Sequence, residues 1–183
     1  VTITCNTLNS KKISAGDIFS FCDIVGKATI EKGYQEADIF VNGEKKQGLG
    51  GGNCQVSTTL YNAVLQVPEL EVLERHQHSA HVPYIKDGKD AAVSYGAYDF
   101  KFKNNTANTI KIVMENTEND ITAKILKIEY YDIKPMTPED AKLKLQERPT
   151  QMFLAFVNVE TSKVNVIHKL KDGKNYGLIE PEA

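Results

Sequence analysis

The amino-acid sequence predicts an α+β fold in which an antiparallel sheet packs on one central helix. Residues 54–66 contain neither Gly nor Pro, and their apolar residues recur at helical spacing. From residue 70 to residue 133, short segments rich in branched and aromatic residues alternate with DG, NN and ND turns, as in an antiparallel sheet. We therefore expect the central helix to start at Cys54, and a small αββ appendage to follow at the C-terminal end.

The segment before the central helix predicts short elements joined by turns. Residues 1–13 have the composition of a helix end or an extended lead-in, and SAGD at 14–17 is typical of a turn. Residues 18–25 predict a buried extended segment. Residues 34–41 predict a strand that enters a hairpin at Asn42-Gly43.

The segments after Pro68, which ends the central helix, are expected to form the strands of the sheet. They are residues 70–84, 91–95, 100–104, 109–116 and 121–133.

The pattern changes near Pro135. Thr137 is expected to cap a short helix with Pro138 in its first position, and the acidic residues that follow suit its first turn. Residues 152–159 and 163–170 then predict a hairpin on which His168 is a surface residue. The predicted domains are residues 1–134 and an αββ appendage at 135–183.

Composition excludes several classes of function. The chain has 183 residues, of which 41% are apolar, with a net charge of −2 and a pI near 6.1, and its basic residues are scattered. We therefore expect no nucleic-acid partner. We also expect no cofactor. No apolar run approaches the roughly 18 residues that cross a bilayer. Because the sequence starts at Val1, we expect a fragment or processed form that meets a membrane only through a segment missing from this chain.

Cys54 is the strongest candidate for chemistry. Three cysteines without a CxxC spacing do not indicate a disulfide framework, and Cys5 and Cys22 are expected to be small buried hydrophobes. If Asn53 caps the helix, Cys54 lies in the first turn, where unpaired amides and the helix dipole stabilise a thiolate. The glycines at 48 and 50–52 allow close backbone approach to a ligand. The alternative is that they only permit a tight turn over a packed cysteine.

Three of the four histidines lie after the helix, within the eight-residue stretch ERHQHSAH at 74–81. His76 and His78 are expected on one face of a strand and His81 on the other. A cysteine at a helix start with a histidine on a later strand is the arrangement of a nucleophilic pair, and Asp90 or Asp99 is the candidate acid that orients the imidazole. Papain-like and transglutaminase-like enzymes use this order, which is an analogy only.

A zinc site is the competing chemistry. His76, His78, His81 and Cys54 together number four potential ligands. The sequence has no second closely spaced ligand pair, so we expect no metal.

Three motifs in one order carry a resemblance to a known family. GGGNCQVSTTLYNAV at 50–64, ERHQHSAHVPY at 74–84 and GKDAAVSYGAYDFKFKN at 88–104 resemble the VanW family of accessory proteins from glycopeptide-resistance clusters. The resemblance covers approximately residues 8–115, so the tail is expected to be a family-independent appendage. The positions carried over are Gly50, Gly51, Gly52, Cys54, Gln55, Ser57, Thr58, Tyr61, Arg75, His78, Ser79, Tyr84, Asp90 and Asp99.

The resemblance implies a bacterial, mostly Gram-positive setting and a location outside the cytoplasmic membrane, in the cell wall or anchored to the membrane. It supplies no reaction. Among the carried-over residues, Gln55 can donate its amide to an oxyanion, and Ser57 and Thr58 are expected to satisfy amides at the helix start. Arg75 can clamp a carboxylate or form a structural ion pair. Tyr61 and Tyr84 are expected to line a cleft or the edge of the core.

Two hypotheses of different class follow. In the first, the protein is a cell-envelope amide hydrolase or acyl transferase that acts on peptidoglycan peptide or a related wall polymer. Its catalytic residues are Cys54, His78, Asp99 or Asp90, and Gln55, and the remaining candidates, Gly50 to Gly52, Ser57, Tyr61, Arg75, His76, His81 and Tyr84, bind substrate. In the second, the protein is a non-catalytic module that binds a wall peptide or glycan.

Overall fold

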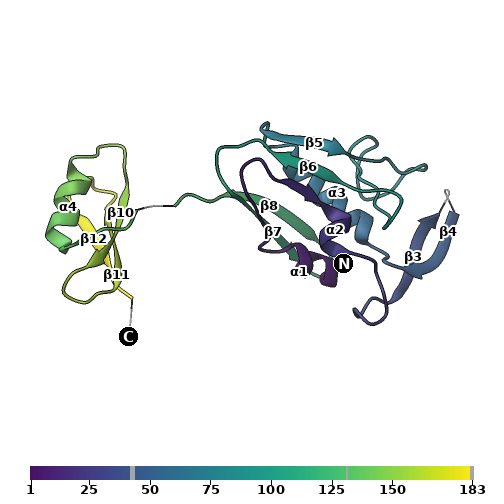
Figure 1. The fold of residues 1–183 in the computed structure, drawn as a ribbon, viewed down its shortest axis with the longest axis horizontal. Helices are drawn as coiled ribbons and strands as arrows, with labels where there is room; N and C mark the ends of the chain where they lie inside the picture. Colours follow the sequence, from purple (N-terminus) through teal and green to yellow (C-terminus); the bar gives the residue numbers. More distant parts are fainter. Residues whose placement is uncertain (42–43, 131, 182–183) are drawn as a thin grey trace. The chain divides into compact units, whose positions relative to one another are not determined.

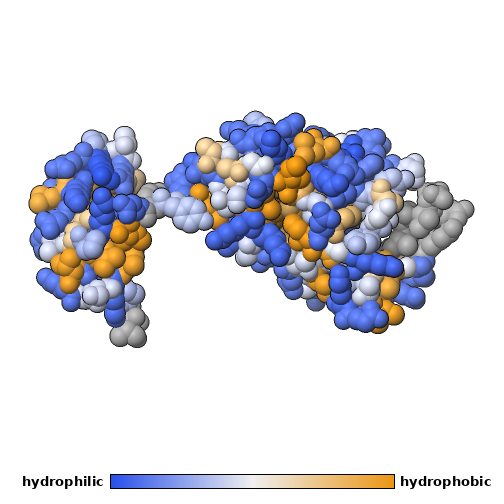
Figure 2. Space-filling model, in the orientation of Figure 1, coloured by the Kyte–Doolittle hydropathy of each residue, from blue (hydrophilic) through white to orange (hydrophobic). Residues whose placement is uncertain are grey.

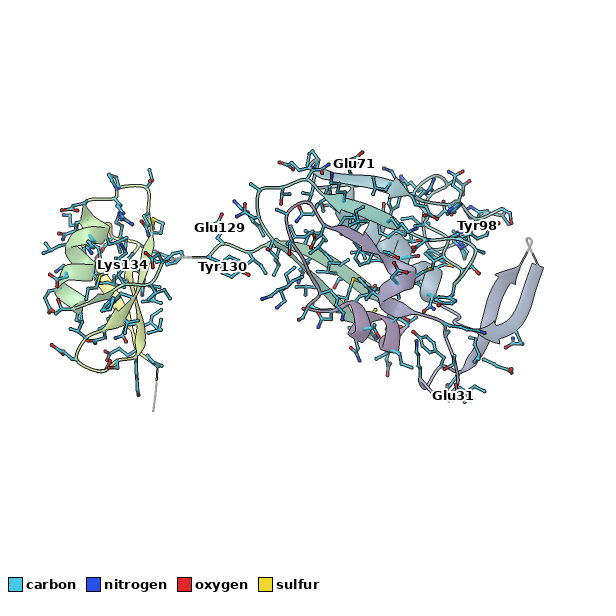
Figure 3. The ribbon with its side chains drawn as sticks, in the orientation of Figure 1. Glu31, Glu71, Tyr98, Glu129, Tyr130 and Lys134 are labelled. Carbon is cyan, nitrogen blue, oxygen red and sulfur yellow. The ribbon has the colours of Figure 1, made fainter. Side chains whose placement is uncertain are left out.

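The computed structural model describes residues 1–41, 44–130 and 132–181, and it divides the chain into two compact units (Figure 1). Unit 1 comprises Val1–Glu129 and unit 2 comprises Tyr130–Ala183. The boundary lies between Glu129 and Tyr130, which Figure 3 labels. Helices and antiparallel strands occur in both units, so the predicted α+β class is confirmed.

Unit 1 contains three helices and eight strands among its described residues. The helices are α1 (Thr2–Leu8), α2 (Phe21–Val25) and α3 (Asn53–Val64). The strands are β1 (Lys12–Ile13), β2 (Ile18–Ser20), β3 (Glu36–Val41), β4 (Glu44–Leu49), β5 (Leu70–Glu74), β6 (Lys101–Asn104), β7 (Ile110–Asn116) and β8 (Ile121–Lys127).

The strands of unit 1 form three antiparallel sheets rather than the single sheet that the sequence predicts. Their orders are β1-β7-β8, β2-β6-β5 and the hairpin β3-β4. The turn expected at Asn42-Gly43 lies outside the described residues. Figure 1 shows α3 between the first two sheets, so the helix that carries Cys54 is central, as expected.

The core of unit 1 joins α3 to both sheets. Val56, Leu60 and Val64 on α3 are fully buried, and they belong to one cluster with the aromatic side chains of β2 and β6. Phe19 stacks on Phe102 with ring centroids 4.7 Å apart. Hydrophilic residues predominate on the face of this unit that Figure 2 shows, and apolar side chains form a narrow band between them.

Two segments differ from the prediction. Residues 18–25 are not one extended segment, because the Ser20 side chain accepts a hydrogen bond from the amide of Asp23 and starts the short helix α2. The sequence also predicts strands that continue over residues 75–84 and 91–95. Apart from isolated bridges, which pair His76 with Ala92 and Ser94 with Tyr98, residues 75–98 form loops.

Unit 2 has more strands than the predicted αββ appendage. It contains β9 (Pro135–Met136), α4 (Pro138–Gln146), β10 (Phe153–Asn158), β11 (Val164–Lys169) and β12 (Tyr176–Ile179), in a sheet of order β12-β11-β10-β9. Thr137 caps α4 by accepting a hydrogen bond from the amide of Asp140, which confirms the predicted cap. Among the described residues of the chain, no helix has the length and apolar character needed to span a membrane.

Candidate functional site

The glycine-rich loop between β4 and α3 places Cys54 in the first turn of α3. Gly50 and Gly52 adopt φ angles of 91° and 86°, which favour glycine because a Cβ atom is strained there. Gly52 is the N-cap residue, so the expected cap at Asn53 is wrong. The side chain of Asn53 instead accepts a hydrogen bond from the Thr4 hydroxyl, with 2.5 Å between the oxygen atoms.

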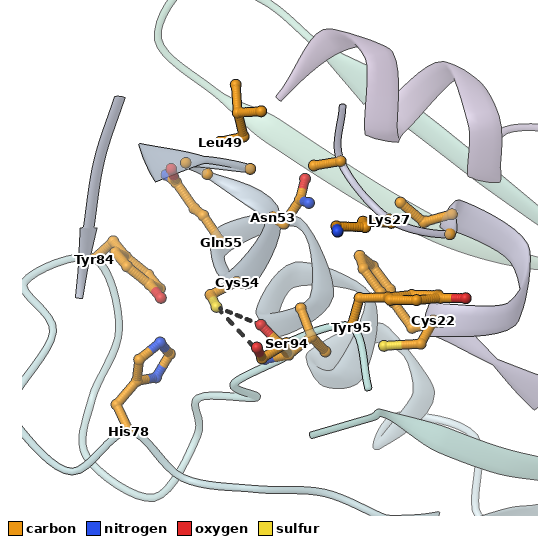
Figure 4. A pocket seen from close by; sticks show the side chains of 18 residues that line it. Cys22, Lys27, Leu49, Asn53, Cys54, Gln55, His78, Tyr84, Ser94 and Tyr95 are labelled. Carbon is orange, nitrogen blue, oxygen red and sulfur yellow. Dashed lines mark hydrogen bonds between the residues drawn. The ribbon is translucent and has the colours of Figure 1, made fainter. Parts of the chain in front are cut away.

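The sulfur atom of Cys54 faces the backbone of Val93. The thiol donates to the carbonyl oxygen of Val93 at 3.4 Å, and the amide of Val93 lies 3.5 Å from the sulfur as a donor (Figure 4). The sulfur can still accept the hydrogen bond from the amide of Val93 after the thiol loses its proton.

His78 is the histidine that the structure brings to this thiol. Hydrogen bonding to Cys54 is the largest cause that raises the pKa of His78, and a hydrogen bond to Asp90 raises it further, whereas burial opposes both. The Nδ1 atom of His78 lies 2.7 Å from Oδ2 of Asp90. The imidazole therefore lies between a thiol and a carboxylate, with its protonated form favoured.

Asp90 is the acid that orients His78, and Arg75 holds Asp90. The Oδ2 atom of Asp90 also accepts from the amide of His78 at 2.7 Å, while Arg75 donates Nη2–H to Oδ1 at 2.9 Å and Nε–H to the Asp90 carbonyl at 2.6 Å. Burial raises the pKa of Asp90, but the hydrogen bonds from His78 and the charge of Arg75 outweigh it and lower the pKa. Arg75 thus forms a structural ion pair, and its guanidinium lies 5.3 Å from the ring centroid of Tyr61.

Asp99, the other candidate acid, lies elsewhere. Its carboxylate accepts from the Ser20 hydroxyl at 2.6 Å, from the amide of Cys22 at 2.9 Å and from the amide of Phe100 at 2.8 Å. It therefore fixes the start of α2 to β6 and is not bonded to His78. This corrects the assignment of Asp99 as an orienting acid. Both aspartates are buried, and the sequence alone does not show which of them contacts His78.

Two hydroxyl groups of α3 fix the segment that carries Asp90 and Val93. Ser57 donates to the carbonyl of Ala91 at 2.5 Å, and Thr58 accepts from the amide of Ala91 at 2.9 Å. Both side chains are buried, so Ser57 is not exposed to bind substrate. They do not satisfy amides at the helix start, as the sequence analysis expected. They join α3 to the loop that faces the thiol.

Cys54 opens onto a pocket of about 600 Å³ in unit 1. Gly50 to Gly52, Gln55, His78 and Tyr84 line it together with Cys54, as Figure 4 shows for the labelled side chains. Burial and the neighbouring Cys54 raise the pKa of Tyr84 to about 12, so this phenol stays protonated near neutral pH. Tyr61 does not line the pocket; its ring packs edge-on against Phe100, with centroids 5.6 Å apart.

The other two clustered histidines lie apart from the thiol. His76 contacts Glu74 at 3.0 Å and the exposed ring of Tyr98, which Figure 3 labels. His81 is exposed and pairs with Asp87 at 2.8 Å. Among the described residues, no three His, Cys, Asp or Glu side chains are grouped so that they could hold a metal ion. The zinc alternative therefore lacks a ligand set, and neither histidine lines the Cys54 pocket.

Sequence reasoning missed several residues that line this pocket, among them Cys22, Lys27, Val93 and Tyr95. Cys22 is half-buried rather than a core hydrophobe, and its thiol donates to the carbonyl of Tyr98 at 3.4 Å. Burial and the charge of Asp99 raise the pKa of Cys22 to about 12. The Ser-x-x-Asp pattern at residues 20–23 is typical of a helix N-cap, and it was the signal in the sequence that a helix begins there.

Comparison with known proteins gives two family matches. Residues 1–126 match the model of the VanW like protein family, and residues 120–178 match the model of the Sigma 54 modulation/S30EA ribosomal protein C terminus. The VanW-like match ends at residue 126, as expected for a tail outside that family, and the tail is instead similar to a second family.

Individual relatives agree with these matches. The YoaR protein of Bacillus subtilis (strain 168) is 41% identical over 104 residues, which are 57% of this chain and 34% of that protein. The Vancomycin B-type resistance protein VanW of Enterococcus faecalis (strain ATCC 700802 / V583) is 30% identical over 129 residues, 67% of this chain and 46% of that protein. The Ribosome hibernation promotion factor of Bacillus subtilis (strain 168) is 36% identical over 69 residues, 38% of this chain and 35% of that protein.

The chain spans less than half the length of each of these relatives. The VanW-like match nevertheless covers more than half of the chain and includes every residue of the Cys54 pocket. This chain belongs to the VanW-like protein family.

Proposed function

We propose that unit 1 is a cell-envelope enzyme that hydrolyses or transfers an amide of a peptidoglycan stem peptide through a thioester on Cys54. The observation that carries the proposal is the continuous arrangement Cys54, His78, Asp90 and Arg75 at the edge of an open pocket. The name of the enterococcal relative, a vancomycin resistance protein, supports a substrate in the cell wall and a location outside the cytoplasmic membrane.

Each group in the arrangement has one role. His78 takes the proton of the Cys54 thiol, and Asp90 holds the imidazole in the required tautomer through Nδ1. The thiolate attacks the carbonyl carbon of the amide, and a C–S bond forms. The C–N bond then breaks, and the leaving amine takes the proton from the imidazolium. Water or a second amine attacks the thioester with His78 as base, which releases the acid or the new amide and restores the thiol.

The first turn of α3 supplies donors for the oxyanion. The amides of Asn53, Gln55 and Val56 already bond to the carbonyl oxygens of Gly50 and Gly52. The amide of Cys54 has no hydrogen-bond acceptor in the part of the chain that the structure describes. It is therefore available for the oxyanion, with the Gln55 side chain in the same pocket as a second donor.

The test is the capture of the acyl group on Cys54. The full chain is incubated with synthetic stem peptides, and intact-protein and peptide mass spectrometry are used to look for a thioester adduct and for new peptide products. The proposal predicts an adduct on Cys54 that is absent in Cys54→Ala and at least 100-fold slower to form in His78→Gln. A wild-type protein that forms neither adduct nor product with any stem peptide contradicts the proposal.

The breadth of the pocket favours one alternative, a module that binds a wall peptide or glycan without reaction. A volume of about 600 Å³ lined by glycines, Leu49 and Tyr95 suits such a ligand. Full activity in cells of the Cys54→Ser variant supports this alternative. Loss of activity with intact folding and peptide binding excludes it.

A further inference from the structure

The wall of the Cys54 pocket carries an uneven charge. Eighteen described residues line the pocket, and none of them is Asp or Glu. The basic side chains among them are Lys27 and His78. A pocket with cations on its wall and no carboxylate favours an anionic group on its ligand.

Lys27 is the basic residue of the pocket wall that is not paired with a described carboxylate. His78 is bonded to Asp90, whereas Lys27 forms no ion pair with any residue that the structure describes. Its side chain is exposed, and Figure 4 shows its ammonium end directed toward the centre of the pocket, on the side of Asn53. Lys27 can therefore meet a ligand without first breaking a contact.

The backbone that carries Lys27 is held in place from both sides. Lys27 follows α2 after the C-cap residue Gly26, and α2 is fixed at its start by the buried carboxylate of Asp99, which accepts from the amide of Cys22. At its end, the carbonyl of Val25 accepts from the Lys32 ammonium at 3.2 Å. Asp99 thus helps to position α2 and the Lys27 side of the pocket, although it does not contact the imidazole of His78.

We propose that this end of the pocket binds a carboxylate of the substrate, at the C-terminus of the peptide, and that Lys27 recognises it. The assignment to a peptide rests on the proposed function. A C-terminal carboxylate lies one residue from the last amide of a peptide, so a contact with Lys27 would direct the thiol to amides near that end. The remaining lining near Lys27 is apolar or uncharged, with Phe21, Val25 and Tyr95, which suits a short side chain next to the carboxylate.

The experiment measures binding separately from reaction. Two peptides with the sequence acetyl-L-Ala-D-isoglutamine-L-Lys-D-Ala are prepared, one with a free C-terminal carboxylate and one with a C-terminal amide, so that no other carboxylate is present. Their dissociation constants are measured by calorimetry with the full chain carrying Cys54→Ser. We expect the free acid to bind about tenfold more tightly than the amide, as one charge-assisted contact provides. Lys27→Met should abolish this preference and Lys27→Arg should keep it.

The control is Lys11→Met, since Lys11 is an exposed lysine outside the pocket and should keep the preference. Equal affinity of the two peptides, no binding of either, or a preference that survives Lys27→Met overturns the inference. A muramic-acid disaccharide that binds in a Lys27-dependent manner while the peptide does not overturns the peptide assignment in favour of a glycan carboxylate.

The two proposals fail separately. A carboxylate preference that depends on Lys27, in a protein that forms no thioester, supports this inference and contradicts the proposed reaction. A thioester that forms equally fast from both peptides, with and without Lys27, supports the reaction and contradicts this inference.

Discussion

Replacement of Asp90 by asparagine removes one charge from the site and keeps its shape. The carboxylate accepts three hydrogen bonds: one from Arg75 to Oδ1 at 2.9 Å, and two from the amide and ring of His78 to Oδ2 at 2.7 Å. In asparagine one of these oxygens becomes an NH₂ donor. Whichever way the amide turns, it points a donor at Arg75 or at His78.

The size of the stability loss in Asp90→Asn follows from the burial of these contacts. The side chains of Asp90, His78 and Arg75 are 7%, 10% and 17% exposed, so the lost contacts are not replaced fully by water. Hydrogen bonds to charged groups contribute about 1.5–3 kcal/mol each, and breaking a buried pair costs about 3–5 kcal/mol. We expect Asp90→Asn to lower the free energy of unfolding of unit 1 by about 3 kcal/mol. Because His78 loses its orienting acid, acylation of Cys54 should slow by about 100-fold or more.

The assay is hydrogen exchange of the full chain in increasing urea, read by mass spectrometry. Peptides from residues 1–129 report unit 1, and peptides from unit 2 are an internal reference that should not change. Asp99→Asn is the matched control, because it alters another buried aspartate whose bond to Ser20 can be kept by rotation of the hydroxyl. Asp99→Asn should lower the free energy of unfolding of unit 1 by about 1 kcal/mol and leave the rate of Cys54 acylation within about threefold of wild type. Equal losses of acylation in both variants would refute the assignment of Asp90 over Asp99.

Other predictions concern thiol reactivity, the glycine-rich loop and pH. Iodoacetamide at pH 7 should label Cys54 at least tenfold faster than Cys22, whose pKa is about 12, or Cys5, which is buried; peptide mapping that finds Cys22 labelled first would contradict this. Gly50→Ala should lower the free energy of unfolding by about 1–2 kcal/mol in urea titrations, because φ is 91° and the added Cβ lies 3.3 Å from Ala28; an unchanged midpoint would argue against this loop geometry. Because the pKa of His78 is raised, its stabilising contribution is complete below its unfolded value of about 6.5 and is lost as pH rises through the folded pKa; hydrogen exchange between pH 6 and 9 should show this loss, and His78→Gln should remove it.

The sequence predicts the elements whose local signals agree with their tertiary contacts. Helix α3 lies where the absence of Gly and Pro and the apolar spacing place it, and Thr137 caps α4. The loops at 75–98 could not be predicted in the same way. Their branched residues resemble strands, but their backbone groups bond to side chains far along the chain, as the amide of Ala91 does to Thr58.

The sequence predicts which residues form the candidate site, but it does not predict which of them contact one another. Cys54, His78 and two aspartates stand out in the sequence, but neither aspartate carries a local signal of its partner, and only the fold brings Asp90 to the ring of His78. Lys27 gave no local signal, because it approaches the pocket through α2, which is fixed by Asp99 from residues far along the chain.

The central claim is that the imidazole of His78 acts on the thiol of Cys54, and the pH dependence of Cys54 alkylation by iodoacetamide tests it most directly. The rate is measured between pH 5 and 9 in the wild type and in His78→Gln, with Cys54 quantified by peptide mapping. The account predicts that below pH 7 the wild type is alkylated at least tenfold faster than the variant, and that the two rates converge toward pH 9, where the thiol no longer needs an internal base. Two profiles that superimpose would contradict the account.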